Sequence, residues 1–163
     1  MKLYGITGWK DQGKTTLVSA LVQHFTAAGL TVSTIKHAHH AFDVDQPGRD
    51  SHRHREAGAA EVILASRKRF ALMHEIRDEA EWELPELIGK LSPVDLVLIE
   101  GYKNAPHPKI EVYREDRGRQ PIALTNPSIR AVAGAAPGHD LRQPVFPLDD
   151  IAAIAAFIRD DAQ

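Results

Sequence analysis

The 163-residue sequence contains no cysteine, which excludes disulfides and thiolate metal sites. Its longest purely apolar run, residues 151–158, is well short of the roughly 20 residues that a membrane-spanning helix requires. The formal net charge of −2 argues against a general nucleic-acid binder, which would be strongly basic. The first residues carry no secretory pattern. We therefore expect a cytoplasmic protein that binds neither nucleic acid nor a membrane.

Strand patterns and helix patterns alternate along the chain. Short apolar or β-favouring runs indicate strands at residues 2–7, 31–36, 95–100, 109–113, 121–124 and 131–133. Apolar residues at helical spacing indicate helices at residues 16–28, 50–58 and 84–91, and a last helix from Asp149 or Asp150 onward. This alternation predicts an α/β fold with a mainly parallel sheet, helices on both faces, and an added antiparallel hairpin at about residues 61–74.

Residues 8–16 read GWKDQGKTT and fit the pattern G-x-x-x-x-G-K-[ST]. The glycines let the backbone curl so that several N–H groups converge on phosphate oxygens, and the following helix points its N-terminus at the same anion. Lys14 supplies a cation for the outer phosphates, and Thr15 supplies a hydroxyl for Mg²⁺. The expected phosphate-binding residues are Gly8, Trp9, Lys10, Asp11, Gln12, Gly13, Lys14, Thr15 and Thr16. The pattern predicts the three-layer P-loop NTPase fold, as a single nucleotide-binding domain over residues 1–163.

A phosphate loop also needs an acid near the metal ion, usually at the end of a neighbouring strand. Glu100 follows the apolar run Leu96-Val97-Leu98-Ile99 and is the candidate for this role. We predict that Glu100 orients a water or contacts Mg²⁺, together with Thr15. Lys14 and Glu100 are therefore the candidate catalytic residues.

The segment 36–59, KHAHHAFDVDQPGRDSHRHREAGA, holds five of the nine histidines. These histidines are His37, His39, His40, His52 and His54. Three interpretations fit the segment. It is a transition-metal site built from imidazoles and carboxylates, a nucleotide-sensing switch loop in which Asp45 approaches Mg²⁺, or a polar loop followed by a helix that Asp50 caps.

Three blocks of the sequence occur together in one family. They are GWKDQGKTTL at residues 8–17, KHAHHAFDVDQPGRDS with REAGA within residues 36–59, and LVLIEGYK at residues 96–103. The segments ASRKRFALMHE (65–75) and PKIEV (108–112) extend the match. The chain resembles the molybdopterin-guanine dinucleotide biosynthesis adaptor family, MobB, as far as about Val112 and more loosely afterwards.

This resemblance implies a protein that binds GTP with Mg²⁺, hydrolyses it weakly and forms a homodimer. The implied partners are the guanylyltransferase that attaches GMP to molybdopterin and the molybdenum insertion enzyme. By the same resemblance, residues 8–16 hold the GTP phosphates, Glu100 is the strand-end acid, and the basic hairpin around residues 67–69 extends the sheet or joins subunits. Hydrolysis is expected to be slow, because no Gln or Arg finger is fixed near the attacking water.

The phosphate loop departs from its relatives at three positions. Asp11 and Gln12 stand where relatives often have Gly or Ser. Related dimeric nucleotide switches place a signature lysine directly after the first glycine, but this chain has Trp9 there and Lys10 one step later. We therefore assign Lys10 no cross-subunit catalytic role.

Guanine preference rests on the resemblance alone, because the base-reading pattern N-K-x-D is absent. The Asn126-Pro127 dipeptide favours a turn, with contact between Asn126 and a base as the alternative. Two other functions stay open: a nickel-type metallochaperone GTPase that uses His39 and His40, and a small-molecule P-loop kinase. The lack of cysteine weakens the first, and the lack of an Arg-rich lid weakens the second.

Overall fold

The computed structural model describes residues 1–38, 42–115, 118–136 and 138–162 of the chain. His39 and His40 lie outside the described residues. The chain forms two compact units, one built from residues 1–37 and 88–163 and the other from residues 38–87. The prediction of a single domain stays a prediction, because this division does not show whether either unit folds alone.

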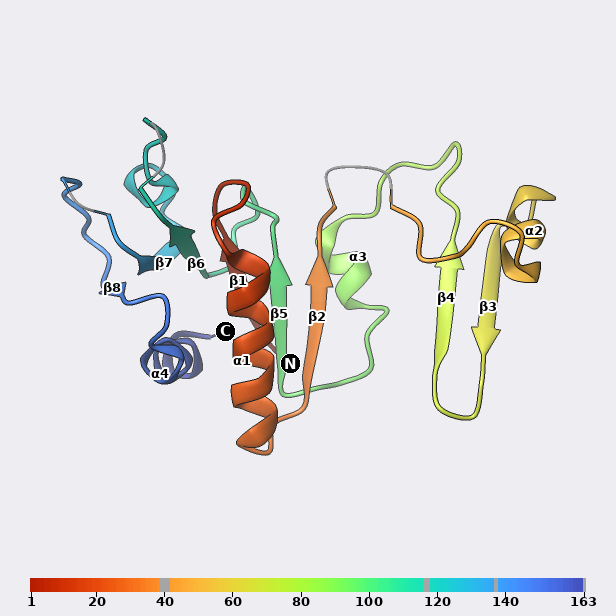
Figure 1. The fold of residues 1–163 in the computed structure, drawn as a ribbon, viewed down its shortest axis with the longest axis horizontal. Coiled ribbons are helices and arrows are strands. Elements are labelled where there is room, and N and C mark those ends of the chain that lie inside the picture. Colours follow the sequence, from red (N-terminus) through yellow and green to blue (C-terminus); the bar gives the residue numbers. More distant parts are fainter. Residues whose placement is uncertain (39–41, 116–117, 137, 163) are drawn as a thin grey trace. The chain divides into compact units, whose positions relative to one another are not determined.

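The first unit is built around a six-stranded sheet in which every neighbouring pair is parallel. The strand order is β2 (Val32–Lys36), β5 (Leu96–Glu100), β1 (Lys2–Thr7), β6 (Lys109–Tyr113), β7 (Ile129–Gly134) and β8 (Val145–Phe146). Figure 1 shows β2 and β5 side by side with their arrowheads at the same end. The predicted α/β class with a mainly parallel sheet is therefore confirmed, and the carboxyl ends of the strands meet along one edge.

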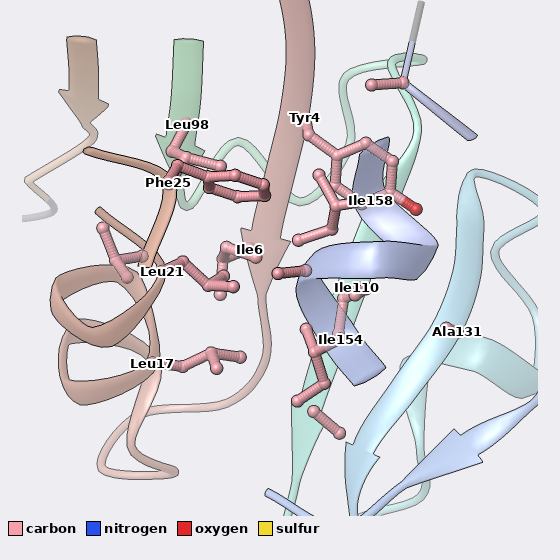
Figure 2. Packing of buried hydrophobic residues seen from close by; sticks show 14 of the residues in the cluster. Tyr4, Ile6, Leu17, Leu21, Phe25, Leu98, Ile110, Ala131, Ile154 and Ile158 are labelled. Atoms are coloured by element: carbon pink, nitrogen blue, oxygen red, sulfur yellow. The ribbon is translucent and has the colours of Figure 1, made fainter. Parts of the chain in front are cut away.

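Two helices cover one face of this sheet. They are α1 (Lys14–Ala27) and α4 (Ile151–Asp161), which pack against each other and against β1, β5, β6 and β7. Figure 2 shows Leu17, Leu21 and Phe25 of α1 pointing toward the strands, with Ile154 and Ile158 of α4 beside them. All five side chains are at most 3% exposed. This apolar core fixes the helix whose first turn carries the phosphate-loop motif.

The helix ends follow local rules. α1 begins at Lys14, two residues before the predicted start, and Gly29 follows it in the left-handed conformation that ends a helix. α4 begins at Ile151, next to the predicted start, and the Asp150 carboxylate caps it by accepting the Ala153 backbone N–H at 3.0 Å. Among the helices that the structure describes, none has the length and apolar character needed to cross a membrane.

A second, smaller apolar cluster lies on the opposite face, where alternation along β6 places Tyr113 away from Val112. The predicted strand at 121–124 is wrong, because residues 122–124 form a single 3₁₀ turn, η1 (Ile122–Leu124). The cause is Glu111, a fully buried carboxylate on β6 that accepts the N–H groups of Ile122 at 2.9 Å and Ala123 at 2.8 Å. Burial raises the pKa of Glu111, and these two bonds oppose that rise.

The second unit contains α2 (Asp50–Glu56), β3 (Glu61–Ala65), β4 (Phe70–His74) and most of α3 (Leu84–Ile88). β3 and β4 form the predicted antiparallel hairpin as a separate two-stranded sheet, in which Ile63 lies opposite Leu72. Its turn is closed by the Ser66 N–H, which donates to the Arg69 carbonyl at 2.8 Å. The Arg55 guanidinium links α2 to the rest of the unit, since it donates to Asp43 and to Glu75. These bonds organise the end of the histidine-rich segment around one cation.

Candidate nucleotide-binding site

The segment between β1 and α1 turns sharply because three of its residues have positive φ angles. These are Gly8 at 142°, Asp11 at 62° and Gly13 at 100°. A Cβ placed on Gly8 would lie 2.3 Å from the Val112 carbonyl oxygen, so only glycine fits where the chain leaves β1. The two motif glycines therefore shape a tight loop over residues 8–13, as the sequence predicts.

The loop leads into the N-terminus of α1, which is open to an anion. Gly13 is the N-cap residue and no side chain caps the helix. The first turn also contains no acidic residue. The backbone N–H groups of Lys14, Thr15 and Thr16 begin this helix, and they carry its partial positive charge. This arrangement suits a phosphate group.

Two of the predicted phosphate-binding residues use their side chains to hold the loop. The Gln12 amide is buried, and its oxygen accepts the backbone N–H of Arg114. The Trp9 indole N–H donates to the Gln120 carbonyl at 3.0 Å, and the Lys103 ammonium lies 4.2 Å from the centre of the indole ring. The loop shape is therefore supported from the segments that follow β5 and β6.

Lys14 is folded back over the loop. Its ammonium donates to the Trp9 carbonyl at 2.6 Å. Burial lowers the pKa of Lys14, while the nearby charges of Glu100 and Asp11 act in the opposite direction. Lys10 and Asp11 are exposed in the same loop. Lys14 thus places its ammonium over the loop, beside the open helix N-terminus.

Thr15 and Glu100 are brought together although they are far apart in sequence. The Thr15 hydroxyl donates to Glu100 Oε1 at 2.9 Å. Glu100 is the last residue of β5 and is 8% exposed, so its carboxylate lies at the sheet edge rather than in open solvent. Lys36, the last residue of β2, reaches the same oxygen at 3.2 Å. The hydroxyl and the carboxylate are hard oxygen ligands of the kind that Mg²⁺ prefers, so this pair fits the predicted metal ion.

A largely apolar cavity of about 790 Å³ adjoins the loop on the α1 side. Its walls come from the first unit: the start of α1, Arg114 directly after β6, the end of β7, and the segment that leads from β8 into α4. The lining residues include Gly13, Thr16, Arg114, Leu148 and Asp149. Cavities of this size and character hold small ligands, and this one opens beside the phosphate loop.

The third predicted metal ligand, Asp45, belongs to the second unit. Its Oδ1 accepts the Ser51 hydroxyl at 2.9 Å, and its Oδ2 lies 3.4 Å from Arg55 Nε. A role for Asp45 at a metal ion stays a prediction. Within the described parts of the chain, no group of three or more His, Asp or Glu residues could hold a metal. The proposed metal ligands His39 and His40 fall outside those parts.

Asn126 forms a turn. Its Oδ1 accepts the Ser128 N–H at 3.0 Å and the Ser128 hydroxyl at 2.7 Å, and its amide nitrogen donates to the Lys103 carbonyl at 2.9 Å. These bonds occupy the side chain as an Asx turn does. The turn interpretation of the Asn-Pro dipeptide is therefore the correct one.

The sequence did not predict several residues that lie at this site. Lys36, Lys103 and Arg114 add positive charge around the loop, and Asp149 lines the cavity. Lys36 and Lys103 lie within motif blocks of the sequence: Lys36 is the last residue of the predicted strand 31–36, and Lys103 follows the predicted strand 95–100. Their position at strand carboxyl ends is the signal that could have found them. Arg114 and Asp149 have no such motif.

A phosphate loop, an open helix N-terminus and a hydroxyl–carboxylate pair at the carboxyl edge of a parallel sheet define a P-loop nucleotide-binding protein. The model of one family, molybdopterin guanine dinucleotide synthesis protein B (MobB), matches residues 3–135. The chain belongs to this family. It is 38% identical over 159 residues to the molybdopterin-guanine dinucleotide biosynthesis adapter protein of Escherichia coli K12, covering 96% of this chain and 90% of that protein. A Haemophilus influenzae protein of the same name is 37% identical, with coverage of 96% and 86%.

Solved structures agree with this assignment. The crystal structure of a MobB homologue from Bacillus stearothermophilus is 25% identical and superposes with a TM-score of 0.72, covering 97% of this chain and 95% of that chain. The structure of Bacillus subtilis MobB, at 21% identity, superposes with a TM-score of 0.77 over 100% and 99% of the two chains, which supports the fold. The resemblance seen in the sequence is therefore confirmed.

We expect Gly8→Ala to destabilise the protein by about 2–4 kcal/mol, because the added methyl group meets the Val112 carbonyl in a backbone conformation that alanine rarely adopts. Urea unfolding measures the change. Gly29→Ala is the matched control, since Gly29 has φ +87° but open space around it. That variant should lose only about 1 kcal/mol. Equal losses in the two variants would contradict the close approach at Gly8.

Proposed function

We propose that this protein is a GTP-binding adapter with weak GTPase activity, which assists guanylyl transfer to molybdopterin in molybdenum cofactor biosynthesis. The main support for this proposal is the phosphate loop together with the hydrogen-bonded pair of Thr15 and Glu100. It occurs in a chain that is 38% identical, along nearly its whole length, to a protein named as the biosynthesis adapter. We place its action in the cytoplasm. No group of metal-binding side chains in the described residues favours the metallochaperone alternative.

Three features of the site suit the phosphates, the metal ion and the base of a nucleoside triphosphate. The backbone of residues 8–13 and the N-terminus of α1 suit the phosphates, with Lys14 as the cation. Thr15 and Glu100 would hold Mg²⁺, which neutralises charge on the outer phosphates when bound. The apolar cavity beside α1 suits a purine ring. The arrangement therefore supports binding of a whole nucleotide rather than of free phosphate.

Asp149 gives a physical reason for guanine preference in the absence of N-K-x-D. Its carboxylate lines the cavity and is exposed. Guanine presents an N1–H and an exocyclic amine on one edge, and a carboxylate accepts both hydrogens. Adenine presents a lone pair at N1 and would be repelled there. We therefore assign Asp149 the role of reading the base.

Calorimetric titration with Mg·GTP and Mg·ATP tests this proposal. We expect binding of GTP in clear preference to ATP. Lys14→Ala should weaken GTP binding by about 100-fold or more, because it removes a charge-assisted contact to the outer phosphates. Asp149→Asn should reduce the ratio of GTP to ATP affinity by about tenfold, since an amide no longer accepts both guanine hydrogens. Equal binding of GTP and ATP by the unsubstituted protein would overturn the guanine assignment.

Weak hydrolysis would depend on Glu100. The carboxylate lies at the end of β5, where it can orient a water or help to hold the metal ion. We expect Glu100→Gln to keep most GTP binding, since glutamine retains the shape, and to lower the hydrolysis rate about 100-fold. Phosphate release under saturating GTP measures this. Glu115→Gln, at an exposed position on the segment after β6, is the control. Undiminished turnover in Glu100→Gln would remove Glu100 from the mechanism.

The hairpin supports a homodimer. Within the described residues, β3 and β4 pair only with each other, and two-stranded hairpins are marginal on their own. Ile63 is 65% exposed, Phe70 74% and Leu72 46%, and the pairing places all three on one face. An exposed apolar face with unpaired strand edges suits a second copy of the same hairpin. We infer that the protein dimerises through β3 and β4.

Light scattering after gel filtration tests this interface. The unsubstituted protein should elute with twice the mass of one chain. The Ile63→Asp, Leu72→Asp double variant should be monomeric, because it places charge on both members of a facing pair. Val145→Asp changes an exposed residue on β8, one of the two edge strands of the six-stranded sheet, and should leave the dimer intact. Dissociation by Val145→Asp alone would move the interface to β8.

The partners follow from the same proposal. Relatives are named adapter proteins of molybdopterin-guanine dinucleotide biosynthesis, so enzymes of that pathway are the partners of the family. For this chain we propose the guanylyltransferase that attaches GMP to molybdopterin, and the molybdenum insertion enzyme as a second partner. Loading of GTP would then control when the adapter binds them.

A further inference from the structure

Lys36 stands at the point where the metal ion and the outer phosphates of a nucleotide would meet. It is the last residue of β2, and its backbone lies opposite Glu100 in the sheet. Its ammonium is 3.2 Å from Glu100 Oε1 and donates to the Thr15 hydroxyl at 3.3 Å. These are the two side chains whose donor atoms fit Mg²⁺. One lysine therefore contacts both members of the candidate metal site.

This contact contributes little to the fold. The Lys36 side chain is 58% exposed, and ion pairs with such an exposed partner contribute little to stability because water screens the charge. The pairing of β2 with β5, and the packing of Val32 against the core, hold β2 in place regardless of the lysine charge. A stabilising role does not explain why a lysine ends this strand.

Electrostatics shows what the lysine does when a divalent cation is held by Thr15 and Glu100. Oxygen ligands lie about 2.0–2.1 Å from Mg²⁺, so the ion and the ammonium would share the same oxygens at very short separation. Two positive charges at that distance repel strongly. The ammonium must then leave Glu100, and its flexible four-carbon stem allows it to do so. The terminal phosphate is the anion that it would then contact, because a metal ion held by Thr15 and Glu100 would lie beside the outer phosphates.

We propose that Lys36 senses the terminal phosphate of the nucleotide: it contacts that phosphate while Thr15 and Glu100 hold Mg²⁺, and it pairs with Glu100 when the nucleotide is a diphosphate. This proposal rests on the proposed function as a GTP-binding protein. It makes Lys36 a residue that distinguishes GTP from GDP. It also makes Lys36 a competitor of the metal ion for Glu100.

The test compares Lys36→Met with Lys36→Arg and with a control, Lys2→Met. Lys2 is an exposed lysine at the opposite end of the sheet, where its ammonium donates to the Arg159 carbonyl. A fluorescent, non-hydrolysable GTP analogue and fluorescent GDP are titrated at several Mg²⁺ concentrations. Lys36→Met should weaken analogue binding about tenfold and change GDP binding less than about twofold. It should also lower the Mg²⁺ concentration needed for half-maximal GDP binding. Lys36→Arg and Lys2→Met should keep the preference for the triphosphate.

Each other outcome is decisive. An unchanged ratio of analogue to GDP affinity in Lys36→Met overturns the role of Lys36, while GTP binding itself stands. Equal loss of both nucleotides, in a variant whose thermal unfolding matches that of the unsubstituted protein, also overturns it, because Lys36 would then bind phosphates generally. Failure of the unsubstituted protein to bind either nucleotide overturns the proposed function and this inference with it.

Discussion

The pairing of β1 with β5 on one side and with β6 on the other is the interaction on which the candidate site depends. Its register places Ile6 opposite Glu100, and Thr7 opposite Glu111. The chain therefore leaves β1 and enters the phosphate loop at the level where both neighbouring strands present a carboxylate. A slip of one residue would turn every side chain of β1 to the other face, and the apolar core under α1 and α4 forbids that slip. Hydrophobic burial of β1 thus sets the position of the phosphate loop relative to Glu100 and Glu111.

Glu100 and Glu111, the two carboxylates beside the end of β1, have different roles because their surroundings differ. Glu111 is fully buried, and its carboxylate accepts two backbone N–H groups of η1. It therefore holds η1 against β6. Glu100 is slightly more exposed, and its carboxylate contacts the tips of two side chains, Thr15 and Lys36. Contacts between side-chain tips can be exchanged without disturbing the backbone. This difference is why one acid is structural and the other is suited to ligand exchange.

Local patterns in the sequence predicted much of the fold and part of the site. The phosphate loop, the acid at the end of β5 and the hairpin were predicted because each is specified by neighbouring residues. The strand expected at 121–124 was wrong because the group that decides the conformation, Glu111, comes from another strand. β8 was missed because its two residues carry no periodicity. The place of Lys36 beside Thr15 and Glu100 depends on strand order, which no local pattern in the chain contains.

The bond between the Gln12 side chain and the Arg114 backbone has a consequence for the rates of nucleotide exchange. It ties the middle of the phosphate loop to the end of β6, so the loop keeps its curled shape through its own protein contacts. A ligand that enters such a loop loses little affinity to ordering of the backbone. Association is then limited by diffusion and desolvation rather than by folding of the loop. Departure of a nucleotide would then require only that its own contacts to the site break, without any unfolding of the loop.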